Sequence, residues 1–152
     1  MLFRSAQVVG AACGVVVANL MFDHDPVEWS TKVRDSGGQV LGEGVATLGL
    51  LLVVFGIARS KRPGSAPFAV GAYITAAYFF TSSTSFANPA VTVARMLTHS
   101  FAGIAPESAP LFLGGQVMGG GVAVVVIGAL YPSARAVAAD LVVPHMTEEV
   151  GP

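Results

Sequence analysis

The chain has 152 residues, of which 53% are hydrophobic and only 11% charged, and its formal net charge is -1. Charged residues normally make up about 25% of a soluble domain, so this composition indicates an integral membrane protein in a lipid bilayer. A chain with so few and so balanced charges offers no basic surface, which argues against nucleic acid as a partner.

Four strongly apolar segments follow one another along the chain, each approaching the roughly 20 residues that a transmembrane helix needs. They cover residues 6–22, 40–58, 66–80 and 111–131. We predict an all-α membrane protein in which each segment is one span within a transmembrane region over 1–133. The remaining residues, 134–152, are predicted to form a poorly ordered cytosolic tail.

Positive charges predict the orientation of these spans. Five cations lie before the first span, between the second and third, and after the fourth: Arg4, Arg59, Lys61, Arg62 and Arg135. If the four spans alternate in direction, all five lie on one side, which the positive-inside rule makes cytoplasmic. The connection over residues 23–38 then faces outward.

A short polar interruption separates the third and fourth spans and ends in Asn88-Pro89-Ala90. Asn is a good helix N-cap and Pro suits the first helical position, so a helix should start here. The segment 88–99 is too short to cross a bilayer, and we predict a re-entrant half-helix. Because lipid cannot satisfy irregular backbone, such a break indicates a pathway lined by protein or water.

The first and last spans share a weak internal repeat. Gln7 is followed by Gly10, and Gln116 is followed by Gly119, with further small residues four positions later. Small residues at this spacing let helix backbones approach closely. Tight packing alone explains the pattern, but beside the Asn-Pro-Ala break it also favours an inverted-repeat channel or transporter.

These features together resemble the aquaporin and glycerol-facilitator (major intrinsic protein) family. The resemblance covers about residues 6–132 and rests on Asn88-Pro89-Ala90-Val91-Thr92, on Glu43-Gly-Val-Ala-Thr47 and on the two Gln-x-x-Gly patterns. It implies an aquaporin-like helical bundle and a passive channel, not an enzyme, with no cofactor, metal or catalytic residue. It also implies a homotetramer with one pore per protomer, in the plasma membrane of a bacterium.

Family members have six spans and two opposed half-helices, whereas this chain has four transmembrane helices plus one re-entrant half-helix. It therefore looks like the third span followed by the complete second half. An alignment with the first half competes, because Asn-Pro-Ala-Val-Thr is more typical there and the second half usually reads Asn-Pro-Ala-Arg. That alternative would place the cations at 59–62 outside, so we favour the second half. We expect a fragment that needs the missing first half to form a pore.

The resemblance also suggests roles for residues around the motif. Asn88 is expected to donate its amide to a passing oxygen, with Pro89 and Ala90 starting the helix beside it. The preceding residues 84–87 are expected to run extended and to present backbone carbonyls to the pathway. Glu43 is expected to accept backbone N–H groups and support that loop. The alternative for Glu43 is a position at the membrane interface.

The expected constriction departs from that of water-selective members. An arginine normally follows the motif asparagine by three residues, and here that position is Val91. The other contributors correspond to Ala76 and Ser85, which gives a wider and uncharged filter. Arg95, one turn beyond Val91, is a candidate to replace the lost charge, or else it contacts lipid headgroups or loop carbonyls. Water, glycerol-like polyols and neutral metalloid acids are the candidate solutes.

Two other functions compete with a channel. A secondary transporter has similar broken helices, but ion coupling normally needs carboxylates near the break, and Glu43 is the only acid within a predicted span. A non-transporting remnant is the other alternative. Asp23-His24-Asp25 contains metal-ligating residue types, but no further ligand spacing supports a metal site.

Overall fold

The computed structural model describes residues 2–60 and 63–131, and all the regular secondary structure in this part of the chain is helical, as predicted. Its α-helices are α1 (Leu2–Met21), α2 (Gly37–Arg59), α3 (Ala66–Phe80), α4 (Pro89–Ala94) and α5 (Ala109–Leu130). Short 3₁₀ turns cover Pro63–Ser65, Arg95–Leu97 and Pro106–Ser108. The predicted tail, 134–152, lies outside the described residues.

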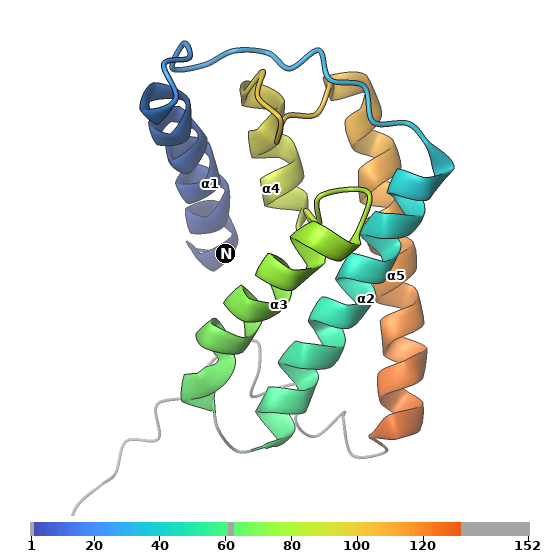
Figure 1. Cartoon of the computed structure of the whole chain (residues 1–152). Coiled ribbons are helices and arrows are strands. Elements are labelled where there is room, and N and C mark those ends of the chain that lie inside the picture. Colours follow the sequence, from blue (N-terminus) through green and yellow to red (C-terminus); the bar gives the residue numbers. More distant parts are fainter. Residues whose placement is uncertain (1, 61–62, 132–152) are drawn as a thin grey trace, which may run out of the picture.

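The four long helices occupy the four apolar segments of the sequence. Within the described part, α2 and the run Pro106–Leu130 are long and apolar enough to cross a membrane, whereas α1 and α3 are shorter apolar helices. In Figure 1, α2 and α5 run side by side, α3 leans against α2, and α1 stands beside α4. The short helix α4 therefore lies between α1 and α5.

Glycines bring α2 and α5 into close contact. A Cβ atom added at Gly119 of α5 would collide with the backbone of Gly44 in α2. One added at Gly115 would lie 2.6 Å from the carbonyl oxygen of Val40. No larger side chain fits between the two backbones without separating them. The small-residue spacing of the last span thus marks the α2–α5 contact, whereas Gly10 and Gly14 of the first span have nothing within 4 Å of an added Cβ.

Helix α4 is shorter than the half-helix predicted over 88–99. It ends at Ala94 and continues as a single 3₁₀ turn. The carbonyl of Arg95 accepts the N–H of Ile104, the carbonyl of Met96 accepts the N–H of Ser30, and that of Leu97 accepts the N–H of Glu28. These carbonyls are bound by loop amides rather than by the next helical turn, so the α-helix stops.

The α1–α2 connection, residues 22–36, crosses the end of the bundle above α4 in Figure 1. Besides the two bonds to the end of α4, its Lys32 carbonyl accepts the N–H of Ala105. It ends at Ser36, whose side chain accepts the N–H of Gln39 and caps α2. The connection is thus tied to the same loops that surround α4.

Candidate functional site

Helix α4 begins at Asn88, as the sequence predicts for an N-cap followed by proline. Asn88 has an extended backbone (φ -154°, ψ 122°), and its side-chain oxygen accepts the N–H of Ala90 at 2.8 Å. Its carbonyl accepts the hydroxyl of Thr92 at 3.1 Å. With Oδ1 engaged by the helix, the NH₂ group is the part of the Asn88 side chain that is left to donate.

The loop before Asn88 is not extended, contrary to the prediction. Thr84, Ser85 and Ala87 have positive φ angles of 63°, 47° and 47°. Residues other than glycine rarely adopt this left-handed conformation, which costs about 1–3 kcal/mol at each position. A left-handed stretch turns successive N–H groups to one side, where they form a concave site for an anion.

The anion at this loop is the carboxylate of Glu43. Glu43 is fully buried in α2, and its two oxygens accept the N–H groups of Phe86 at 2.7 Å and Ala87 at 2.9 Å. A buried charge is tolerated only when hydrogen bonds replace its lost hydration. The contacts therefore explain how the left-handed loop is held and how Glu43 stays buried.

Gln116 of α5 connects the carboxylate of Glu43 to Thr92, which follows Asn88 in α4. Its Nε2 atom donates to Oε2 of Glu43 at 2.7 Å and to Oγ1 of Thr92 at 2.9 Å. Since Thr92 in turn donates to the carbonyl of Asn88, residues from α2, α4 and α5 form one continuous network. Sequence reasoning treated Gln116 only as part of a packing repeat and missed this contact.

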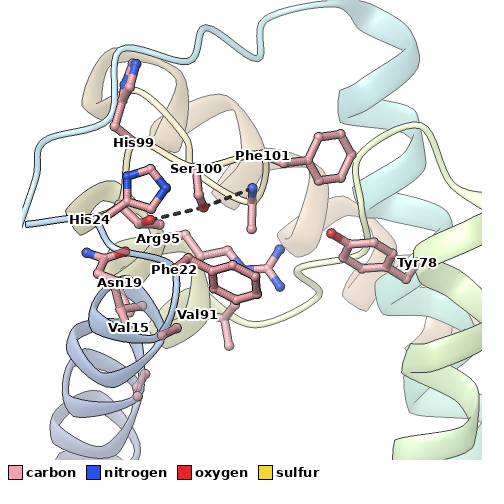
Figure 2. A pocket seen from close by; sticks show the side chains of 16 residues that line it. Val15, Asn19, Phe22, His24, Tyr78, Val91, Arg95, His99, Ser100 and Phe101 are labelled. Carbon is pink, nitrogen blue, oxygen red and sulfur yellow. Dashed lines mark hydrogen bonds between the residues drawn. The ribbon is translucent and has the colours of Figure 1, made fainter.

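Two of the four residues expected at the constriction line one cavity. Val91 and Arg95 line a cavity of about 770 Å³ between α1, α4 and Tyr78. Figure 2 shows this cavity with the guanidinium of Arg95 extending toward Tyr78. Ser85 is buried and Ala76 is exposed on α3, and neither lines the cavity.

Several buried polar atoms near the motif have no hydrogen-bond partner among the described residues. They are the hydroxyls of Thr47, Thr84 and Ser85, the side-chain oxygen of Gln116 and Nη1 of Arg95. Buried polar groups are usually satisfied, so unpaired ones are candidates to bind water or a polar solute. Thr84 and Ser85 lie shortly before Asn88 in the sequence, and Gln116 is a member of the Asn88 network.

Arg34 is a further buried residue that sequence reasoning missed. It lies in the α1–α2 connection, only 2% exposed. Its guanidinium donates to the carbonyls of Gly103 at 2.8 Å, Phe101 at 2.8 Å and Ser83 at 3.2 Å. The available signal was two cations, Lys32 and Arg34, within a mainly acidic connection. Arg34 thus joins three loops around the cavity.

The described residues offer no site of the kind that holds a metal ion. In these ranges, no three His, Cys, Asp or Glu side chains gather closely enough to ligate one. His24 is instead within 3.6 Å of Glu28, one turn along the connection.

Comparison with known proteins gives one informative relative. The chain is 49% identical over 114 residues to the protein named aquaglyceroporin AqpS of Rhizobium meliloti (strain 1021). The match covers 75% of this chain and 48% of that protein, so the chain spans about half the length of the relative. No protein-family model and no solved structure matches the chain. The identity extends over three-quarters of the chain, which belongs to the aquaporin and glycerol-facilitator family of membrane proteins.

Proposed function

We propose that the chain is part of a passive membrane channel for water and small neutral solutes such as glycerol. The name of its relative, an aquaglyceroporin, supports this solute class. The chemistry of the region supports it too, because hydrogen-bonding groups suit uncharged polar molecules and no group in it suggests a chemical reaction. Coupled ion transport is less well supported, since the buried carboxylate of Glu43 is already occupied by three donors.

The observation that carries the proposal is the way in which Asn88 is held. Glu43 fixes the backbone just before it, and Gln116 fixes Thr92 just after it. Two long apolar helices thus hold one polar side chain rigidly, at the start of a short helix. A rigid donor can replace part of a solute's hydration as the solute passes, which a mobile donor does less well.

The proposed membrane arrangement has four spans, α1, α2, α3 and α5, and a half-helix at α4 entering from the outside. In this arrangement the α1–α2 connection is extracellular and Arg59 is cytoplasmic. The full-length protein is proposed to be a homotetramer in the bacterial inner membrane. The residues of this chain need a first half, from the same polypeptide or another, to complete each pore.

The proposed constriction is wide and bears no charge at residue 91. Asn88 donates to the solute, and Val91 borders the path with an apolar side chain. Ala76 and Ser85 do not line the cavity of this chain, and they are proposed to border the path once the first half completes the pore. Arg95, which lies on the same cavity wall as Val91, supplies positive charge farther along the path. Neutral metalloid acids remain candidates because they resemble small polyols in size and hydrogen bonding.

The test is solute flux into liposomes that contain the full-length protein, followed by light scattering after an osmotic step with glycerol. A channel should speed glycerol entry and bring its concentration only to equality across the membrane. Accumulation beyond equality when an ion gradient is applied would identify a transporter. Glycerol entry no faster than in protein-free liposomes would contradict both transport functions and favour a non-transporting remnant.

A further inference from the structure

The strongest unexplained feature outside the Asn88 network is the charge of Arg34. Its hydrogen bonds go to three carbonyl groups, which satisfy N–H donors but do not neutralise a cation. No carboxylate within the described ranges lies at ion-pair distance from it, and the carboxylate of Glu43 attracts it from farther away. Burial lowers the pKa of Arg34 from its usual value, but a guanidinium stays protonated at neutral pH. A full positive charge is thus buried in the α1–α2 connection.

The guanidinium groups of Arg34 and Arg95 both contact the aromatic ring of Phe86. The Cζ atom of Arg34 lies 5.4 Å from the centroid of Phe86, and that of Arg95 lies 4.3 Å from it. Cation–π contacts of this kind stabilise each charge by roughly 0.5–2 kcal/mol. They do not remove the repulsion between two like charges that contact the same ring, and Arg95 also forms no ion pair with a described carboxylate.

Phe86 cannot move to relieve that repulsion. It is 3% exposed, its ring packs 5.1 Å from that of Phe112, and its N–H is bound to Glu43. The two guanidinium groups are consequently held near each other by a fixed platform. Glu43 attracts both guanidinium groups but carries a single negative charge, so the cluster keeps a net positive charge. Holding that charge in a buried position costs stability, which a hydrophobic pair would not. Such a cost indicates a role other than folding.

The location indicates that role. Arg95 lines the same cavity wall as Val91, the position that lacks the arginine expected in water-selective relatives. Arg34 lies behind Phe86 at the loops of Ser83, Phe101 and Gly103, and Phe101 also lines the cavity. The positive charges of Arg34 and Arg95 repel a cation that enters the cavity. They do so without a long side chain at residue 91, which would narrow the path.

We propose that Arg34 is a specificity-determining residue of the channel, which acts with Arg95 to exclude cations. The two guanidinium groups around Phe86 supply the positive potential that Val91 does not, and leave the constriction wide enough for polyols. The inference rests on the proposed function, since it assigns the ion selectivity of the same pathway. A unit charge about 10 Å from an ion, at an effective dielectric of about 20, changes the ion's occupancy roughly tenfold.

The experiment measures K⁺ efflux from K⁺-loaded liposomes that contain the full-length protein, beside glycerol entry in the same preparation. The variants are Arg34→Met, Arg34→Lys and Arg95→Met. Arg59→Met is the matched control, because Arg59 also lies over an aromatic ring, 5.2 Å from the centroid of Tyr131, but at the opposite end of α2. Methionine keeps the unbranched stem of arginine while it removes the guanidinium charge.

K⁺ efflux should rise roughly tenfold in Arg34→Met and in Arg95→Met, and stay at the wild-type level in Arg59→Met and Arg34→Lys. Lysine keeps the charge but cannot reach all three carbonyls, so its variant separates charge from bracing. Arg34→Lys and Arg34→Met leaking equally, or Arg34→Met behaving like Arg59→Met, would overturn the inference. If Arg34→Met fails to fold, Arg34→Gln takes its place, because its neutral amide still donates to a loop carbonyl. Wild-type K⁺ efflux in a folded Arg34→Gln would overturn the inference.

The same experiment tests the proposed channel function separately, through glycerol entry into liposomes with the wild-type protein. A wild-type protein that admits no glycerol contradicts the channel proposal, whatever its K⁺ efflux. The K⁺ measurement needs no glycerol pathway, so a charge-dependent leak in the variants would still support the role of Arg34. Unchanged K⁺ efflux in charge-removed variants that still admit glycerol would contradict the role of Arg34 alone.

Discussion

Gln116 donates a 2.7 Å hydrogen bond to the carboxylate of Glu43, across the contact between α5 and α2. The glycines that bring these helices together make the bond possible: Gly115 and Gly119 lie on one helix and Gly44 on the other. Both side chains are buried. The pair therefore links helix packing directly to the backbone around Asn88.

The Glu43→Gln substitution tests the carboxylate. Three donors converge on Glu43, from Phe86, Ala87 and Gln116, and an amide offers a single acceptor oxygen for them. Each buried donor left unpaired costs about 1–3 kcal/mol. We expect a lower thermal unfolding midpoint in detergent and roughly tenfold slower glycerol entry into liposomes.

Glu28→Gln is the control for this change, because Glu28 lies partly exposed in the α1–α2 connection and pairs only with His24. An exposed pair of this kind contributes little stability. Unfolding and glycerol entry in Glu28→Gln should match the wild type. Glu43→Gln behaving in the same way as Glu28→Gln would show that the loop does not depend on the carboxylate.

Gly119→Ala tests the helix contact itself. The added methyl group meets the backbone of Gly44, which cannot rotate away as a side chain can. Separating α2 from α5 should cost about 1–3 kcal/mol and lengthen the bond from Gln116 to Glu43. Gly121→Ala on the same helix is the control, since nothing lies within 4 Å of its added Cβ. Equal unfolding midpoints for the two variants would refute the close contact.

Asn88→Asp separates the two tasks of the asparagine. Aspartate is also a good N-cap, so its oxygen should still accept the N–H of Ala90, and unfolding should stay close to that of the wild type. An ionised carboxylate has no N–H to donate, and glycerol entry should fall roughly tenfold. Asn88→Ala, which loses the cap as well, should unfold more readily by about 1 kcal/mol. Normal glycerol entry in Asn88→Asp would exclude the proposed donor role.

The sequence was sufficient for the features that depend on local pattern. Long apolar runs predicted α2 and α5, and the Asn88-Pro89 pair predicted where α4 begins, because capping and proline geometry act within one turn. The end of α4 was not predictable in this way. Its last carbonyls are bound by Ser30 and Glu28, which lie more than 60 residues earlier in the chain.

The conformation around Ser85 and the burial of Arg34 also depend on distant partners. Positive φ is rare in Thr, Ser and Ala, so residue type predicts an extended loop before Asn88. Glu43 overrides that preference by binding two consecutive N–H groups from 43 and 44 residues away. The carbonyls around Arg34 come from loops 49 to 69 residues later, and no spacing rule connects them.

Val91→Arg tests whether residue 91 sets the width of the path. The long, charged side chain would enter the cavity that Val91 and Arg95 line. It should narrow the path for a three-carbon polyol more than for water, so the ratio of glycerol to water permeability should fall roughly tenfold. Val91→Leu adds bulk without charge and should lower that ratio much less. Light scattering with glycerol and with an impermeant solute gives both permeabilities in one preparation. An unchanged ratio in Val91→Arg, in a protein that still passes water, would place the size limit elsewhere in the channel.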